Sequence, residues 1–193
     1  MWGDAGGKWM TIPNYITIFR FFLVPVVIYA IFNNQMALAL IGFVVAGLSD
    51  GVDGFIARRY NQRSELGAYL DPIADKILLV SIFVVFGYLG LLPLWLVYLV
   101  VSRDALIIGA VVLSTVMGNP VEMHPLFISK ANTATQIVLA AFVLADLTFV
   151  LEYPLLQSGL IWIVALLTGL SATAYLVQWL RHMAGFAETD GES

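Results

Sequence analysis

Two pairs of aspartates occupy a polar segment between two long apolar runs of the sequence. Asp50 and Asp53 are three residues apart, and Asp71 and Asp75 are four residues apart. If the flanking runs are helical, each spacing places its two carboxylates on one helix face. Carboxylates without a neighbouring histidine or cysteine form an oxygen-only ligand set, which suits Mg²⁺ or Mn²⁺. Four of them can hold two such ions, an arrangement that stabilises phosphoryl transfer.

The elements that carry these aspartates must be membrane helices, because the chain is too apolar for a soluble domain. Of its 193 residues, 61% are hydrophobic and 11% are charged, against about 25% charged residues in soluble proteins. A membrane helix needs about 20 mostly apolar residues. Six segments meet this requirement, and clusters of Asn, Gly and Pro separate them; they are residues 14–32, 36–58, 68–89, 94–117, 127–151 and 156–181.

The sequence therefore predicts an all-α integral membrane protein with six transmembrane helices. Its nine Lys and Arg residues lie at or near one side of these spans, except Arg103, which lies within a span. By the positive-inside rule, both termini and the aspartate segment are cytoplasmic, and the protein is a multi-pass protein of the inner or plasma membrane. We expect residues 1–183 to form one membrane domain and residues 184–193 an acidic, disordered tail.

The aspartates have a simpler alternative interpretation as solvated helix ends. A carboxylate at the bilayer centre costs about 2.5–3.5 kcal/mol, and less near the interface. Two facing pairs would also repel one another, so a cation must lie among them. Nearby arginines could supply part of this charge, although they also suit the loop and lipid headgroups. An active-site cavity that opens to the cytoplasm and holds divalent ions accounts better for both pairs.

The segment "DGVDGFIARRYNQRSELGAYLDPIAD" resembles the signature of the CDP-alcohol phosphatidyltransferases, D-x2-D-G-x2-A-R-x8-G-x3-D-x3-D. Every fixed position is present; these are Asp50, Asp53, Gly54, Ala57, Arg58, Gly67, Asp71 and Asp75. Gly54, Ala57 and Gly67 are small, which suits helix packing but also leaves room for a flat nucleotide. Eight identities at fixed spacing make this motif specific.

The resemblance implies a six-helix, usually dimeric enzyme that transfers a phosphatidyl group from a CDP-linked donor to an alcohol and releases CMP. All four aspartates would bind the metal ions, and Asp75 would also be the base that takes the proton of the alcohol. The expected donor-binding residues are Gly54, Ala57, Arg58, Ser64 and Gly67, with Asn14 and Thr17 from the first span. We expect a lipid bilayer, CDP-diacylglycerol and a second copy of the chain as partners, and no nucleic acid.

The acceptor alcohol must be inferred from other segments. Residues 12–26 resemble the start of family members that use glycerol-type acceptors, and residues 102–114 and 127–141 resemble the CMP-forming cardiolipin synthases of the family. Asn14, Thr17 and Arg20 form a polar stripe, which also fits an interfacial cap with a snorkelling arginine. Arg20, Arg103 and Lys130 are candidates for binding the acceptor or its phosphate, although Arg103 could instead pair structurally with a carboxylate.

These segments favour phosphatidylglycerol as the acceptor, with cardiolipin and CMP as products. In relatives that use glycerol 3-phosphate we expect a more basic stretch where this chain reads "SKANT" (129–133). A phosphatidylglycerophosphate synthase remains the alternative within the family. An ion or solute transporter is an alternative of a different class, but polar residues gather on one side of the spans here. The preferred metal, acyl chains and oligomeric state stay open.

Overall fold

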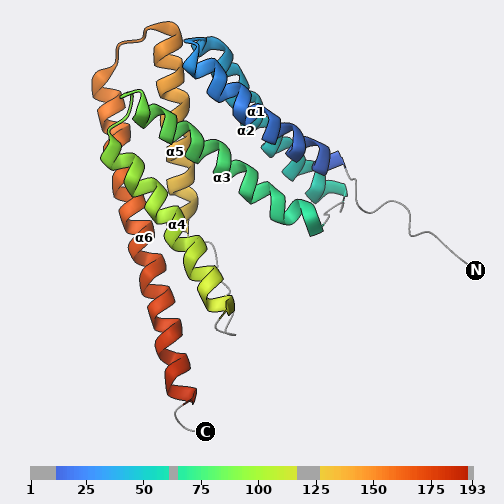
Figure 1. The fold of residues 1–193 in the computed structure, drawn as a ribbon, viewed down its shortest axis with the longest axis vertical. Coiled ribbons are helices and arrows are strands. Elements are labelled where there is room, and N and C mark those ends of the chain that lie inside the picture. Colours follow the sequence, from blue (N-terminus) through green and yellow to red (C-terminus); the bar gives the residue numbers. More distant parts are fainter. Residues whose placement is uncertain (1–11, 61–64, 117–126, 191–193) are drawn as a thin grey trace, which may run out of the picture. The chain divides into compact units, whose positions relative to one another are not determined.

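A computed structural model of the chain contains six α-helices in its described residues, and those residues form no strand (Figure 1). The described backbone covers residues 12–60, 65–116 and 127–190, with side chains at 19–49, 76–110, 113 and 127–180. The helices are α1 (Ile12–Phe32), α2 (Met36–Tyr60), α3 (Glu65–Tyr88), α4 (Leu94–Val116), α5 (Phe127–Phe149) and α6 (Pro154–Asp190). Each coincides with one of the six apolar segments expected from the sequence.

The far end of α6 differs from the sequence expectation. The apolar pattern places the end of the last span near residue 181, whereas the helix continues to Asp190. It therefore extends into the acidic segment 184–193 that the sequence analysis treats as a disordered tail. Ala184, Ala187 and Glu188 in this stretch are good helix formers, so a helix can continue there without an apolar face.

Three short turns join α1 to α2, α3 to α4, and α5 to α6, and each contains a residue with positive φ. Asn34 (φ 57°) and Gly90 (φ 73°) are residue types that tolerate the left-handed region. The α5–α6 turn instead places Val150 and Glu152 there, at φ 51° and 55°. Asp146 supports this turn, because its Oδ1 accepts a hydrogen bond of 2.9 Å from the backbone N–H of Glu152.

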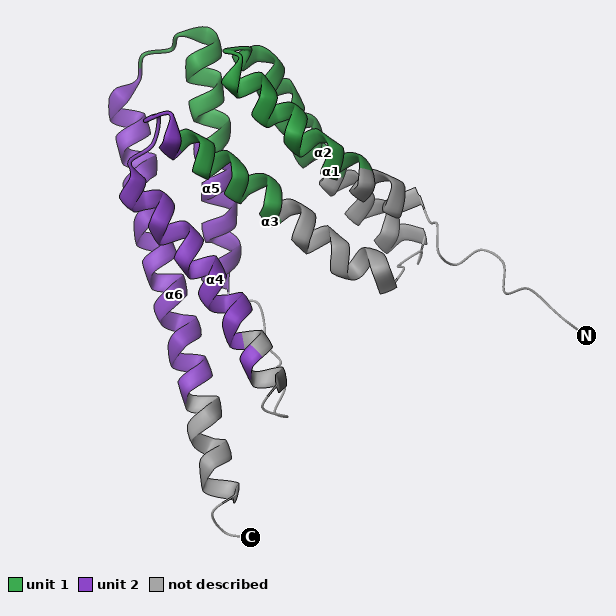
Figure 2. Cartoon of the chain, in the orientation of Figure 1, with its two compact units in different colours: residues 1–86, 140–152 green, residues 87–139, 153–193 purple. Residues whose placement is uncertain are grey.

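The chain divides into two compact units (Figure 2). Unit 1 comprises Met1–Phe86 and Ala140–Glu152, and unit 2 comprises Gly87–Leu139 and Tyr153–Ser193. Helix α5 contributes its first part to unit 2 and its second part to unit 1. Each unit has its own buried contacts.

In unit 1, α1 and α2 pack against each other through small and β-branched side chains. Val27, Ala30 and Ile31 of α1 are buried, as are Ala39 and Ala46 of α2. The α1 positions recur at three and four residues and the two α2 positions are seven residues apart, which are the spacings of one helix face. Because small side chains allow close approach, the two helix backbones can lie close together along this face.

In unit 2, α4 packs against α6, and one helix face of each is buried. The apolar part of the α4 face includes Leu96, Val97 and Val100, and the α6 face includes Val164. At one end of this contact the rings of Trp95 and Trp162 lie 5.5 Å apart at their centroids. Both tryptophans are exposed, which is typical of aromatic side chains at a membrane interface.

The described residues contain two helical stretches that are long and apolar enough to cross a bilayer. They are Phe127–Phe149 and Pro154–Leu180. Three shorter apolar stretches lie in α1, α2 and α3, at Phe19–Phe32, Met36–Ser49 and Lys76–Tyr88. A membrane protein is consistent with this finding, while six spans with a cytoplasmic cavity stay a prediction.

Candidate active site

The four aspartates of the signature lie on two helices, as their spacing predicts. Asp50 and Asp53 are in α2, and Asp71 and Asp75 are in α3. Because both pairs are in α-helical backbone, each pair shares one helix face. Their side chains lie outside the described residues, so the convergence of the four carboxylates on metal ions stays a prediction.

The residues expected to bind the CDP donor have a similar status. Asn14 and Thr17 are in α1, Gly54, Ala57 and Arg58 are in α2, and Gly67 is in α3. Ser64 lies in the segment 61–64, outside the described residues. The side chains of the other donor-binding candidates also lie outside the described set, and their contacts stay predictions.

The three basic residues expected to bind the acceptor have described side chains with different environments. Arg20 of α1 is fully buried in unit 1, and Arg103 of α4 is 3% exposed in unit 2. Lys130 of α5, also in unit 2, is exposed. Lys130 and Arg103 therefore offer two different kinds of cation, one accessible and one enclosed.

Arg103 is held by side chains from all three helices of unit 2. Its Nε and Nη2 both donate to Oγ of Ser171 on α6, at 3.2 and 2.7 Å. Nη2 also donates to Oγ of Ser129 on α5, and Nη1 donates to Oδ1 of Asp104 at 2.6 Å. The guanidinium carbon lies 5.7 Å from the ring centroid of Tyr175, which adds a cation–π contact.

The pairing of Arg103 with Asp104 is the structural alternative that the sequence left open, and it is present. Both side chains are nearly inaccessible, with 2% and 7% of their surfaces exposed. An arginine inside a membrane helix is costly unless a partner compensates its charge. Asp104 supplies that charge from the adjacent position, so the pair carries no net charge into the interior of unit 2.

Further polar side chains continue along the faces of α5 and α6. Asn132 and Gln136 are fully buried on α5, and Oδ1 of Asn132 accepts a hydrogen bond of 2.9 Å from the hydroxyl of buried Thr168 on α6. We call the whole set the polar seam; it comprises Arg103, Asp104, Ser129, Asn132, Gln136, Thr168 and Ser171. Nδ2 of Asn132 and the amide of Gln136 have no hydrogen-bond partner among the described residues. The polar seam therefore has hydrogen-bonding capacity beyond its own pairs.

Sequence reasoning singled out Arg103 and Lys130 but not the serines and amides around them. Ser129, Asn132 and Gln136 are spaced by three and four residues, and Thr168 and Ser171 are spaced by three. This spacing puts each group on one helix face. A polar stripe on an otherwise apolar helix is the signal that could have identified both groups before the structure was known.

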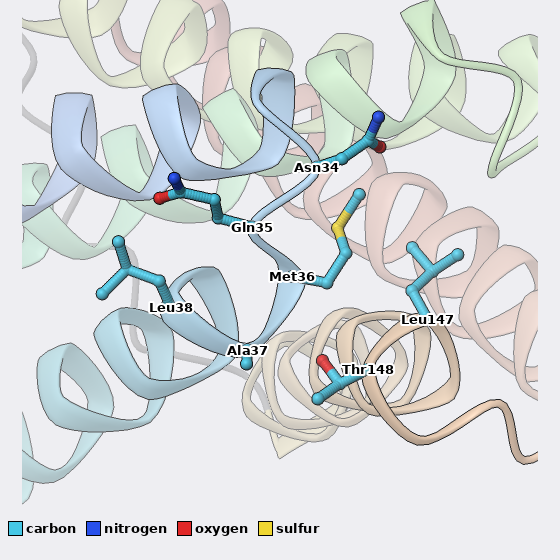
Figure 3. A pocket seen from close by; sticks show the side chains of 7 residues that line it. All are labelled: Asn34, Gln35, Met36, Ala37, Leu38, Leu147 and Thr148. Carbon is cyan, nitrogen blue, oxygen red and sulfur yellow. The ribbon is translucent and has the colours of Figure 1, made fainter.

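A pocket in unit 1 is lined by none of the site candidates (Figure 3). It has a volume of about 420 Å³ and is lined by the α1–α2 turn and the end of α5, with side chains of Asn34, Gln35, Met36, Ala37, Leu38, Leu147 and Thr148. None of these side chains is a carboxylate, a cation or a nucleophile with an adjacent base. We therefore assign no catalytic role to this pocket.

Comparison with known proteins decides the family. The sequence profile of the CDP-alcohol phosphatidyltransferases matches residues 10–170, which is most of the chain. The chain belongs to the CDP-alcohol phosphatidyltransferase family. The matched region contains the four aspartates, Arg20, Arg103 and Lys130, and it spans parts of both units.

Several curated relatives in this family carry more specific names. The human protein named cardiolipin synthase (CMP-forming) is 40% identical over 170 residues, covering 77% of this chain and 56% of its own length. A Drosophila melanogaster protein named probable cardiolipin synthase (CMP-forming) is 35% identical over 90% of this chain and 58% of its own length.

A relative with a different acceptor in its name also matches. The chloroplastic CDP-diacylglycerol–glycerol-3-phosphate 3-phosphatidyltransferase 1 of rice (Oryza sativa subsp. japonica) is 32% identical over 91% of this chain and 59% of its own length. The chain thus spans little more than half the length of these curated relatives.

Proposed function

We propose that this protein transfers the phosphatidyl group of CDP-diacylglycerol to a hydroxyl of phosphatidylglycerol, giving cardiolipin and CMP. The complete family signature on α2 and α3 is the observation that carries the donor chemistry. The names of the human and Drosophila relatives support cardiolipin and CMP as the products. The reaction takes place at the membrane interface, where the acyl chains of both lipids can remain in the bilayer.

The donor set at the signature fits a divalent metal. Its ligands are four carboxylates without histidine or cysteine, which are the oxygen donors that Mg²⁺ and Mn²⁺ prefer. In the proposal, Asp50, Asp53, Asp71 and Asp75 hold two such ions. Bound there, the ions would neutralise the diphosphate and stabilise the charge that develops on the departing CMP.

The side chains perform the remaining steps of the proposed reaction. Asp75 takes the proton from the acceptor hydroxyl as the alcohol oxygen bonds to the phosphorus that carries diacylglycerol. The bond from that phosphorus to the oxygen of CMP breaks, and CMP leaves with this oxygen. Arg58 contacts the diphosphate of the donor through its planar guanidinium, with Gly54, Ala57 and Gly67 leaving room for the nucleotide.

The charges of unit 2 support a lipid phosphodiester as the acceptor. Asp104 neutralises Arg103, and no ion pair is described for exposed Lys130. Among the described side chains of this unit, Lys130 is thus the basic group that has no ion-pair partner. One positive charge suits the single negative charge of a phosphodiester better than the nearly double charge of glycerol 3-phosphate. We therefore assign Lys130 to the negative charge of the phosphatidylglycerol headgroup, and Arg103 to a hydrogen bond with the same headgroup.

Phosphatidylglycerophosphate synthesis is the second candidate function, because the rice relative named for glycerol 3-phosphate matches 91% of this chain. A panel of acceptors separates the two functions. Purified protein receives CDP-diacylglycerol and Mg²⁺ or Mn²⁺, together with phosphatidylglycerol, glycerol 3-phosphate, serine or inositol phosphate. We expect CMP release and cardiolipin with phosphatidylglycerol alone. A product from glycerol 3-phosphate would reassign the acceptor, and absence of CMP with every alcohol would refute the enzyme class.

The proposal also includes a homodimer, as the family resemblance implies. Many large apolar side chains of the described helices are exposed, including Phe22 and Tyr29 of α1 and Leu166 of α6. Lipid and a second copy of the chain can both cover such faces. Chemical cross-linking of the protein in native membranes, followed by a mass measurement, distinguishes a dimer from a monomer in lipid.

A further inference from the structure

We propose that Ser129 and Ser171 are positioning residues of the acceptor site, which act by fixing the orientation of the Arg103 guanidinium. The inference rests on the proposed function, in which Arg103 faces the headgroup of the acceptor lipid. It concerns two hydroxyl groups that neither the family signature nor the acceptor candidates include.

The hydrogen bonds of Arg103 leave its guanidinium little freedom to rotate. A guanidinium has five N–H donors in one plane. Ser171 accepts from Nε and Nη2, Ser129 accepts from Nη2, and Asp104 accepts from Nη1. Among the described residues, one N–H of Nη1 therefore has no acceptor. The two serines thus determine which N–H of Arg103 can reach a ligand and in which direction it points.

The partners of Arg103 come from three different helices. Asp104 is on α4 with Arg103 itself, Ser129 is near the start of α5, and Ser171 is on α6. Ser129 also precedes Lys130, the exposed cation assigned to the same headgroup. A bond from Arg103 to Ser129 therefore fixes the helix turn that carries Lys130, so both cations of the proposed acceptor site depend on these contacts.

The serine contacts can be removed without removing the packing of the helices. Asn132 and Thr168 form a separate hydrogen bond between α5 and α6. Tyr175 stays against the guanidinium, and Asp104 still compensates its charge. We therefore expect serine-to-alanine variants to fold and to show a specific defect in acceptor binding.

The test compares Ser171→Ala and Ser129→Ala with hydroxyl-deleting controls on the same helices. Thr173→Ala is the control on α6, since its exposed hydroxyl bonds to the carbonyl of Gly169. Thr135→Ala is the control on α5, where the hydroxyl bonds to the carbonyls of Ala131 and Asn132. For each variant, KM and kcat for phosphatidylglycerol, KM for CDP-diacylglycerol and the Tm are measured in mixed micelles.

We expect Ser171→Ala to raise KM for the acceptor about 10-fold or more, because a hydrogen bond to a charged group is typically worth that factor or greater. Ser129→Ala should have a smaller effect, since it removes a single acceptor. In the two serine variants, KM for the donor should stay within about twofold of the wild type. In both control variants, KM for the acceptor should stay within the same range, which corresponds to less than 1 kcal/mol. Adding Ser171→Ala to Arg103→Lys should cause no further rise in KM, because lysine lacks the fork that the serine holds.

Three outcomes would overturn the inference. A fall in acceptor KM for Ser171→Ala would mean that the serine competes with the acceptor for Arg103. Equal increases in donor and acceptor KM, following the Tm, would mean a purely structural role. Normal turnover with an unchanged acceptor KM would remove the inference alone, whereas absence of CMP release from the wild type with every acceptor would remove the proposed function as well.

Discussion

At the scale of single residues, Asp75 has the most demanding role in the proposed reaction, as a metal ligand and as the base. Asp75→Asn should lower kcat by about 10²–10⁴-fold through the loss of proton transfer, and further through the weakened metal site. CMP release is the measurement, and retention of CDP-diacylglycerol on the purified variant shows that the donor still binds. Asp146→Asn is the matched control, because Asp146 supports the α5–α6 turn and its Oδ1 is retained in asparagine. Near-normal turnover of Asp75→Asn would assign the base to another residue.

The four aspartates together predict dependence on a hard divalent cation. EDTA should abolish CMP release, and excess Mg²⁺ or Mn²⁺ should restore it, because carboxylate oxygens prefer these ions. Zn²⁺ is an informative comparison, since structural zinc sites use histidine and cysteine ligands and the chain has no cysteine. Full activity in the presence of the chelator would contradict the metal site while leaving the family assignment intact.

At the scale of helices, two glycines of α2 provide a direct test of the α1–α2 contact. A Cβ on buried Gly42 would lie 2.8 Å from Cγ2 of Val27, whereas a Cβ on Gly47 meets no atom within 4 Å. Valine has a stiff χ1 angle and cannot move aside easily. Gly42→Ala should therefore cost about 1–3 kcal/mol by overpacking, and each kcal/mol lowers the Tm by about 2–4 °C in a chain of this size.

Gly47→Ala controls for the change in helix propensity, which favours alanine over glycine by about 0.5–1 kcal/mol at either position. It should leave the Tm unchanged or raise it slightly. The double variant Val27→Ala with Gly42→Ala should recover part of the loss, because the contacted methyl group is then absent. Equal Tm values for Gly42→Ala and Gly47→Ala would contradict the close packing of α1 on α2.

The positions of the helices were predictable from the sequence because long apolar runs alternate with Asn, Gly and Pro clusters. The aspartates adjoin two of these apolar runs, so their positions on α2 and α3 were predictable for the same reason. The pairing of Arg103 with a carboxylate was an alternative that the sequence left open. Its contact with Ser171 was not predictable, since Ser171 is 68 residues away and meets Arg103 only when α4 packs on α6. The continuation of α6 to Asp190 was also not predictable, because an apolar pattern cannot show where a polar extension of the same helix stops.

At the scale of the whole molecule, two possible topologies differ in the number of membrane spans. The apolar runs predict six spans, and the described residues contain two stretches that meet the length and composition for a span. With six spans, the α1–α2, α3–α4 and α5–α6 turns all lie on the side opposite the signature. With two spans formed by α5 and α6 alone, the first two of these turns would lie on the side of the signature.

Single cysteines can distinguish these topologies without background, because the chain contains none. Gln35→Cys, Leu89→Cys and Tyr153→Cys place a thiol in each of the three turns, where the native side chains are exposed. Gln62→Cys and Glu122→Cys place one in each of the two segments predicted to be cytoplasmic.

In spheroplasts of an expressing bacterium, a membrane-impermeant maleimide should label the three turn cysteines from outside. It should label the other two cysteines only after the membrane is lysed. The nine basic residues predict this orientation, since Lys and Arg are retained on the cytoplasmic side. Labelling of Tyr153→Cys without Gln35→Cys or Leu89→Cys would contradict six spans, and the opposite labelling of all five positions would reverse the orientation.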